Sequence, residues 1–187
     1  MLFRHLSLVL RPGGLLRIAG ENGRGKTSLL RILCGLLLPS AGEVRWNGAP
    51  IRELKEEYSR QLVYVGHAPG VKDELTPAEN LRITCRLAGF SAVAEAVAEA
   101  LELLAVPAGV PVKKLSQGQR RRAALARLVV SGDVPLWLLD EPFAALDSAA
   151  VALLERLIAE HAARGGMVVL TTHQEMRLQS DILDLGA

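Results

Sequence analysis

Apolar and polar positions follow two different periods along the chain, and the two periods alternate. Short, nearly continuous apolar runs are typical of strands that are buried on both faces of a parallel sheet. Between these runs, apolar residues recur at the spacing of amphipathic helices. The pattern predicts strands at residues 3–10, 15–20, 42–48, 62–66, 134–142, 167–173 and 181–186, and helices at residues 26–38, 77–89, 91–105, 115–131 and 148–166.

The alternation of strands with long helices predicts an α/β fold with a mostly parallel sheet. Residues 77–130 carry no strand pattern and therefore indicate an α-helical subdomain. The dipeptide Asn47-Gly48 is a strong hairpin signal, so a small antiparallel β subdomain is expected around it. The length fits one structural unit, and we expect residues 1–187 to form a single domain.

The composition adds that the chain is globular and close to electrically neutral. Half of its 187 residues are hydrophobic, 22% are charged and the net charge is +2. This balance gives little support to nucleic-acid binding, and Arg120–Arg122 is interpreted as a solvated helix face. No apolar run approaches the ~18 residues of a membrane span, so any membrane role is expected to need a partner. Cys34 and Cys85 are expected to be reduced, buried thiols.

Residues 20–27, GENGRGKT, match the phosphate-binding pattern G-x-x-x-x-G-K-[ST] between a predicted strand and a predicted helix. Glycine allows the backbone to wrap around a phosphate, and the N–H groups at the helix start favour an anion. Lys26 can reach the terminal phosphates of a bound nucleotide, and the hydroxyl of Thr27 can bind Mg²⁺. A chance glycine-rich turn is the weaker interpretation in this context. The nucleotide-binding candidates here are Gly20, Glu21, Asn22, Gly23, Arg24, Gly25, Lys26, Thr27 and Ser28.

Two carboxylates end the apolar run at residues 134–142. Ligands of open α/β sheets bind at the carboxyl ends of the strands, and acids placed there favour a nearby cation. Asp140 is therefore predicted to orient Mg²⁺, and Glu141 to act as the base for an attacking water. A helix cap or a solvated loop is the alternative, and the phosphate loop weighs against it.

A second phosphate-binding device is indicated by the segment LSQGQ, residues 115–119, which opens onto a helix. Ser116 offers a hydroxyl, Gly118 allows close backbone approach and the helix start attracts an anion. The simpler alternative is an ordinary N-cap made by Ser116.

With these segments in hand, the sequence resembles the ATP-binding cassette (ABC) ATPases. LSQGQ is similar to their signature motif, GENGRGKT to the Walker A loop and VPLWLLDEP to the Walker B strand with its glutamate. Residues 145–147, ALD, resemble the D-loop, and His173 resembles the switch histidine. The motifs follow the family's order from about residue 6 to residue 175. The resemblance implies a P-loop NTPase core with the helical subdomain carrying the signature motif.

The resemblance also implies a homodimer that pairs head to tail. Each ATP is then held between the Walker A loop of one chain and the signature loop of the other. The residues implied to contact the partner's nucleotide are Leu115, Ser116, Gln117, Gly118, Gln119 and Asp147. Those implied to serve catalysis are Glu141, His173 and His67.

His67 stands where most members of the family carry a glutamine near Mg²⁺ and the attacking water. The phrase GHxxGVKxELTxxENL, residues 66–81, resembles one subgroup, the ATP-binding subunits of bacterial cytochrome c biogenesis exporters. That resemblance implies an ATPase at the cytoplasmic face of the inner membrane, paired with integral membrane subunits and serving heme delivery or export. An incidental loop histidine is the alternative for His67.

Three other functions stay open from the residues. Another small ABC exporter, for lipid, peptide or drug, would carry the same motifs. A DNA-repair ATPase would need long coiled-coil arms, and no sustained heptad pattern is present. A regulatory binder without hydrolysis is disfavoured by Lys26, Asp140, Glu141 and His173. The family's adenine-stacking aromatic upstream of the Walker A loop has no counterpart here, so weakened adenine binding is expected.

Overall fold

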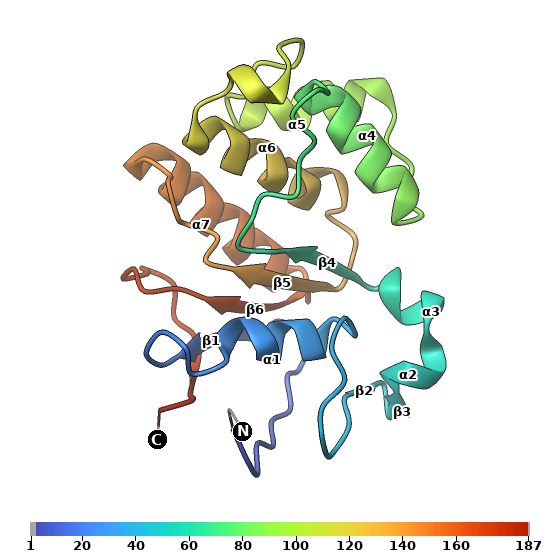
Figure 1. The fold of residues 1–187 in the computed structure, drawn as a ribbon, viewed down its shortest axis with the longest axis vertical. Helices are drawn as coiled ribbons and strands as arrows, with labels where there is room; N and C mark the ends of the chain where they lie inside the picture. Colours follow the sequence, from blue (N-terminus) through green and yellow to red (C-terminus); the bar gives the residue numbers. More distant parts are fainter. Residues whose placement is uncertain (1–2, 187) are drawn as a thin grey trace.

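A sheet of five parallel strands runs through the middle of the computed structural model, which describes residues 3–186 (Figure 1). Its strands stand in the order β4-β5-β6-β1-β7, so β1 lies between β6 and β7 although it comes first in the chain. The bounds are β1 Leu15–Ala19, β4 Leu62–Val65, β5 Leu136–Asp140, β6 Met167–Thr171 and β7 Asp181–Asp184. All four strand pairings are parallel, so the carboxyl ends of the strands meet at one edge. The predicted mostly parallel α/β fold is confirmed.

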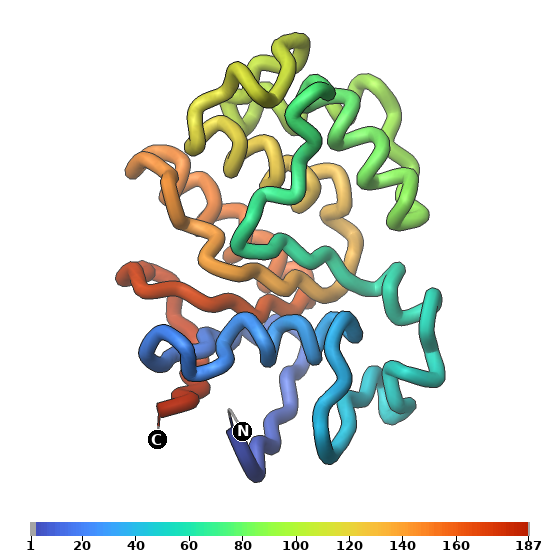
Figure 2. The backbone as a smooth tube through the Cα atoms, viewed as in Figure 1, coloured from blue at the N-terminus to red at the C-terminus, as the bar shows by residue number. Residues whose placement is uncertain are grey.

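Helices cover both faces of this sheet, because alternate residues of each strand point in opposite directions. Leu136 and Leu138 of β5 pack in one apolar cluster with α1, Lys26–Leu33. Trp137 and Leu139 pack in a second cluster with α6, Gln117–Val130, and α7, Ser148–Ala163. In Figures 1 and 2, α1 accordingly lies on one side of the sheet and α6 and α7 on the other.

A block of helices stands beyond α6, made of α4, Pro77–Leu87, α5, Ala94–Leu103, and a short 3-10 helix, Val112–Lys114 (Figure 1). Thr76 caps α4 through a capping box with Glu79. The buried Asn80 side chain accepts from Lys72 N at 2.7 Å and donates to Lys72 O at 3.0 Å. The loop that leads from β4 to α4 is therefore fixed to the start of the helix block.

The small antiparallel sheet consists of β2, Arg45–Trp46, and β3, Ala49–Pro50. Asn47 and Gly48 between them have φ values of 50° and 86°, as a tight hairpin turn requires. The helices α2, Ile51–Leu54, and α3, Glu56–Ser59, follow and lead into β4. The hairpin prediction is confirmed, although the strands are shorter than the predicted run of residues 42–48.

Two predicted elements differ from the structure at their borders. The segment 3–10 forms no strand; β1, which follows it, is paired on both sides, with β6 and with β7. The alternating apolar side chains of this segment still pack half-buried against the α1 side of the core. The helix predicted at residues 26–38 ends at Leu33, since Gly35 takes a φ of 77° that terminates it.

Two interpretations of single side chains are corrected. Cys85 is a buried free thiol, but Cys34 is only half-buried, because it lies at the exposed end of α1. Arg121 is 3% exposed and does not belong to a solvated face, since α6 turns it toward the sheet. Within residues 3–186, no helix combines the length and the apolarity needed to cross the bilayer.

A buried aromatic pair joins α7 to β5. The rings of Trp137 and His161 are stacked with centroids 3.9 Å apart and planes 5° apart, and both residues are 2% exposed. Burial lowers the pKa of His161, and the charge of Arg164 adds to this effect. The folded state therefore binds a proton at His161 less readily than the unfolded state does.

We expect this histidine to make stability depend on pH. Because its folded pKa lies below the unfolded value of 6.5, stability is present above that value and is lost as the pH falls through the folded pKa. The free energy of unfolding, from urea titrations at about pH 7.5 and about pH 5, should fall less in His161→Leu than in the wild type. His5→Gln, at an exposed histidine, is the control. Equal pH dependence in wild type and His161→Leu would contradict the assignment.

Candidate active site

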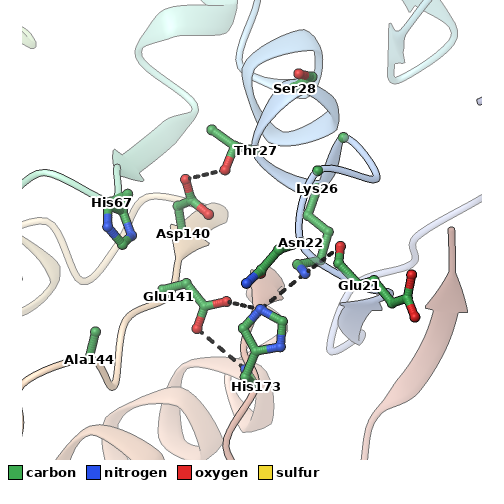
Figure 3. A pocket seen from close by; sticks show the side chains of 12 residues that line it. Glu21, Asn22, Lys26, Thr27, Ser28, His67, Asp140, Glu141, Ala144 and His173 are labelled. Atoms are coloured by element: carbon green, nitrogen blue, oxygen red, sulfur yellow. Dashed lines mark hydrogen bonds and ion pairs between the residues drawn. The ribbon is translucent and has the colours of Figure 1, made fainter. Parts of the chain in front are cut away.

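A cavity of ≈ 740 Å³ opens at the carboxyl edge of the sheet. Figure 3 shows side chains from four separate segments that point into it: the loop after β1, the turn after β4, the end of β5 and the loop after β6. The lining residues are Glu21, Asn22, Gly23, Gly25, Lys26, Thr27, Ser28, His67, Asp140, Glu141, Ala144 and His173. The structure thus brings together most of the residues predicted for one nucleotide site.

The phosphate loop gets its shape from glycines in left-handed conformations. Gly23 and Gly25 have φ values of 84° and 97°, which side chains other than glycine adopt with strain. Gly25 is the N-cap of α1, so the first N–H groups of this helix face the cavity. Lys26 Nζ donates to Gly20 O at 2.5 Å and to Glu21 O at 3.2 Å, which holds the ammonium inside the loop. This is an anion-binding arrangement.

The carboxylate of Asp140 lies at the junction of three elements. Asp140 is 1% exposed, and its Oδ2 accepts from Thr27 Oγ1 of α1 at 2.9 Å. Its Oδ1 accepts from Thr171 Oγ1 of β6 at 2.8 Å. The oxygen of Thr171 also accepts from Glu141 N at 2.9 Å. Thr171 therefore orients both acids, one through its hydroxyl proton and the other through the main chain.

Glu141 directs its carboxylate toward His173 from a strained backbone. Its φ is 48°, in the left-handed region, and its Oε1 lies 3.4 Å from His173 Nε2. Its Oε2 accepts from His173 N at 3.3 Å. The same His173 Nε2 lies 3.1 Å from Lys26 Nζ. His173 thus bridges the carboxylate to the phosphate-loop lysine, as the dashed lines of Figure 3 show.

His67 lines the cavity on the side of Asp140, away from His173 (Figure 3). It is exposed, and a single residue, Gly66, separates it from the end of strand β4. Its ring nitrogens can donate or accept hydrogen bonds in the cavity.

Thr27 and Asp140 fit a Mg²⁺ ion. Both present oxygen atoms to the cavity, and oxygen is the ligand type that Mg²⁺ prefers, with water completing its octahedral shell. Thr27 Oγ1 and Asp140 Oδ2 lie 2.9 Å apart, so both oxygens would be within reach of a single bound ion.

Other predicted site residues lie outside this cavity. The segment Leu115–Gln119 opens α6, where Ser116 forms a capping box with Gln119. Asp147 caps α7 by accepting from Ala150 N at 2.8 Å. The side chain of Arg24 is half-exposed and lies 3.7 Å from Glu21. Within the single chain, the hydrogen bonds of Ser116 are therefore those of an N-cap, as the simpler alternative predicted.

Two residues that shape the site were missed from the sequence. Thr171 is a polar residue inside an otherwise apolar strand and is 0% exposed, a combination that requires a polar partner. Arg121 shares a helical stripe with Ala124, Leu125 and Leu128, all of them buried. That spacing was the available signal that Arg121 faces inward.

Comparison with known proteins decides the family. The family model described as ABC transporter matches residues 3–144, which is most of the chain.

The chain belongs to the ABC transporter family. The cytochrome c biogenesis ATP-binding export protein CcmA of Aromatoleum aromaticum is 54% identical over 99% of this chain and 88% of its own length. The protein of the same name from Pseudomonas aeruginosa is 47% identical over 100% of this chain and 93% of its own. A dimeric ATP-binding cassette solved in a post-hydrolysis state with ADP and Pi has a TM-score of 0.78 and 26% identity, covering 92% of this chain and 80% of that one.

These findings confirm the resemblance to the ABC family and the ABC ATPase fold. Membership of this family makes the chain a nucleotide-binding ATPase. The phosphate loop, Asp140, Glu141 and His173 meet in one cavity of this ABC ATPase, whereas the segment Leu115–Gln119 does not line that cavity.

We predict that Thr171→Val impairs ATP hydrolysis. The valine has a similar shape but leaves Asp140 and the Glu141 amide each without one hydrogen bond, at a cost of about 2 kcal/mol in stability. The turnover number should fall about tenfold or more, because Asp140 and Glu141 lose the hydroxyl that orients them. Steady-state ATPase assays and urea unfolding measure the two effects.

Thr172→Val is the matched control for this change. Thr172 is also buried, but within residues 3–186 its hydroxyl accepts from Gln174 N, at 3.0 Å, and makes no hydrogen bond to Asp140 or Glu141. Wild-type turnover in Thr171→Val, or an equal loss in Thr172→Val, would refute the role of Thr171.

Proposed function

We propose that this chain is the ATP-binding and ATP-hydrolysing subunit of an ABC export complex for c-type cytochrome biogenesis, acting in heme delivery or export. The observation that carries the hydrolytic part is the grouping of Lys26, Asp140, Glu141 and His173 around one cavity. The biological role is supported by relatives named as cytochrome c biogenesis ATP-binding export proteins, at 46–54% identity over nearly the whole chain.

The proposed reaction is in-line attack of water on the γ-phosphorus of ATP. Glu141 takes the proton of the attacking water, and the bond between the γ-phosphorus and the bridging oxygen breaks to leave ADP and phosphate. Lys26 and the amides of the phosphate loop bind the charged oxygens. His173, within 3.4 Å of Glu141, orients the carboxylate and contacts the γ-phosphate side of the cavity. His67 positions the water from the opposite side.

Mg²⁺, held by Thr27 and Asp140, would supply positive charge that neutralises the phosphates when ATP is bound. Two sets of residues are proposed to bind the nucleotide: Gly20 to Ser28 of the phosphate loop in one chain, and Leu115 to Gln119 with Asp147 in the other. This requires a head-to-tail homodimer. The exposure of Ser116 and Gln117 at the start of α6 supports it, since both lie at the surface, where a second chain can approach.

We further propose one ABC ATPase domain, residues 1–187, in which residues 77–130 form the helical subdomain. The domain would sit at the cytoplasmic face of the bacterial inner membrane, bound to integral membrane subunits. The loop after His67 is the proposed contact with those subunits. Its tip is exposed, while Asn80 holds its base with bonds to Lys72 and Thr76.

Glu141→Gln should bind ATP and Mg²⁺, assemble into an ATP-dependent dimer and turn over negligibly. The amide keeps the size of the side chain but cannot accept the water proton. Size-exclusion chromatography with ATP and a phosphate-release assay measure the two properties. Glu160→Gln, at an exposed acid on α7, is the control for the loss of one charge. Normal turnover in Glu141→Gln would remove this residue from the reaction.

The same variant tests the biological role. A strain that lacks the chain should mature c-type cytochromes when it expresses the wild type but not Glu141→Gln. The ATPase rate of the purified chain should also change when its membrane subunits are added. Full cytochrome c maturation without the chain would contradict the proposed role while leaving the ATPase intact.

His67→Ala should lower both ATPase activity and cytochrome c maturation, whereas His67→Gln should retain most of each. Glutamine is the residue that the family usually has here, and its amide can make comparable hydrogen bonds. Turnover numbers and cytochrome c levels in cells give the readout. If His67→Ala leaves both intact, the histidine only fills space.

A further inference from the structure

The guanidinium of Arg121 sends hydrogen bonds to main-chain oxygens of two loops. Toward the turn after β4, its Nη1 donates to Gly66 O at 2.7 Å and to His67 O at 3.3 Å. Toward the end of β5, its Nη2 donates to Asp140 O and to Glu141 O, each at 2.7 Å, and its Nε donates to Pro142 O at 3.3 Å. One side chain therefore joins the segment that carries His67 to the segment that carries Glu141.

This arrangement meets a need of the parallel sheet. Strands β4 and β5 end side by side, and the carbonyl groups at and beyond their ends need donors because their bonds to Arg121 lie in partly or fully buried surroundings. A planar guanidinium offers five N–H donors in a fixed fork, which suits two adjacent loops. Burial lowers the pKa of Arg121, and the charges of Asp140 and Glu141 oppose this effect. The acids thus help to keep the guanidinium charged behind the cavity.

The contact also bears on the strained residue of the site. Glu141 has a φ of 48°, which a residue with a side chain adopts only where its surroundings hold it. Arg121 donates to its carbonyl and to the carbonyl before it, on both sides of the strained position. This main-chain conformation is the one that directs the Glu141 carboxylate to His173.

The helix that carries Arg121 is the one that begins with the signature loop. Arg121 lies five residues after Ser116, and its neighbour Arg120 contacts Asp73, further along the loop after His67, with Nη1 and Oδ1 2.8 Å apart. A shift of α6 would therefore move both the His67 loop and the end of β5. The signature loop, which is proposed to contact the partner's nucleotide, is connected in this way to the hydrolytic residues of its own chain.

We propose that Arg121 is a positioning residue for ATP hydrolysis, which acts through main-chain carbonyls to hold His67 and Glu141 in their working places and links both to the signature helix. Arg121 is not among the residues that line the cavity. The proposal rests on the proposed function, because it assigns Arg121 to the same hydrolytic site.

Arg121→Lys and Arg121→Met test it in the full-length chain. Lysine keeps the charge but cannot reach both loops with a fork, and methionine keeps the apolar stem without the charge. Both variants should bind about one Mg-ATP per chain with a KM within about threefold of the wild type, because the phosphate loop is untouched. Turnover per bound nucleotide should fall about tenfold to a hundredfold, as expected for a catalytic group displaced by about 1 Å.

Arg127→Lys is the matched control. Arg127 lies on the same helix and donates to Tyr64 O, inside β4, at 3.2 Å; among the described residues it makes no hydrogen bond to residues 66–67 or 140–142. It should lower the melting temperature, as the Arg121 variants do, while turnover per bound nucleotide stays within about twofold of the wild type.

Each outcome decides. Wild-type turnover in Arg121→Lys and Arg121→Met would overturn the proposal. So would a failure of both variants to fold and bind ATP, or an equal loss of turnover in Arg127→Lys, since either assigns Arg121 a purely structural role. If the wild type itself hydrolysed no ATP, the proposed function would fail instead.

Discussion

The buried carboxylate of Asp140 is the group on which the geometry of the nucleotide site depends. A carboxylate at 1% exposure is destabilising unless donors surround it, by several kcal/mol in typical proteins. Thr27 and Thr171 are those donors, and they come from α1 and from β6. The requirement to satisfy one charge therefore fixes the first turn of α1 against the ends of two strands. The phosphate loop precedes that turn directly, so its position relative to Glu141 follows from the same two hydrogen bonds.

The sequence predicted the parts of this site whose chemistry is local. A glycine-rich loop between a strand and a helix, and acids at the end of an apolar run, carry their function within a few residues. Thr171 and Arg121 could not be assigned in this way, because their partners lie far along the chain: Thr171 is 31 residues from Asp140, and Arg121 is 55 from Gly66. The absence of a strand at residues 3–10 has a similar cause. The alternating pattern reports one buried face, but a strand also needs a partner at long range, and β1 beside it is paired on both sides with other strands.

Residues of the signature loop and the D-loop show that a structural reading and a functional reading can hold for the same side chain. Ser116 and Asp147 each cap a helix by accepting from a main-chain amide. Gly118 packs so close to the D-loop that a Cβ would come within 2.9 Å of Ala145 O, where a side chain would force the two loops apart. Capping fixes the direction of the helix start, and the helix start is what attracts an anion. A well-made N-cap is therefore part of the preparation for phosphate binding and no argument against it.

The segment around His67 joins a fixed base to an open tip. Its first carbonyls are held by Arg121, and its far end is held by Asn80, both of them buried side chains. The residues between, among them Asp73, are largely exposed; the Asp73 side chain contacts Arg120 of α6, and its carbonyl accepts from Lys113 N at 3.0 Å. Of the two buried side chains, Arg121 also holds the Glu141 main chain. The Arg121 guanidinium therefore connects the base of the loop to the main chain of Glu141 through hydrogen bonds that an apolar residue at this position could not make.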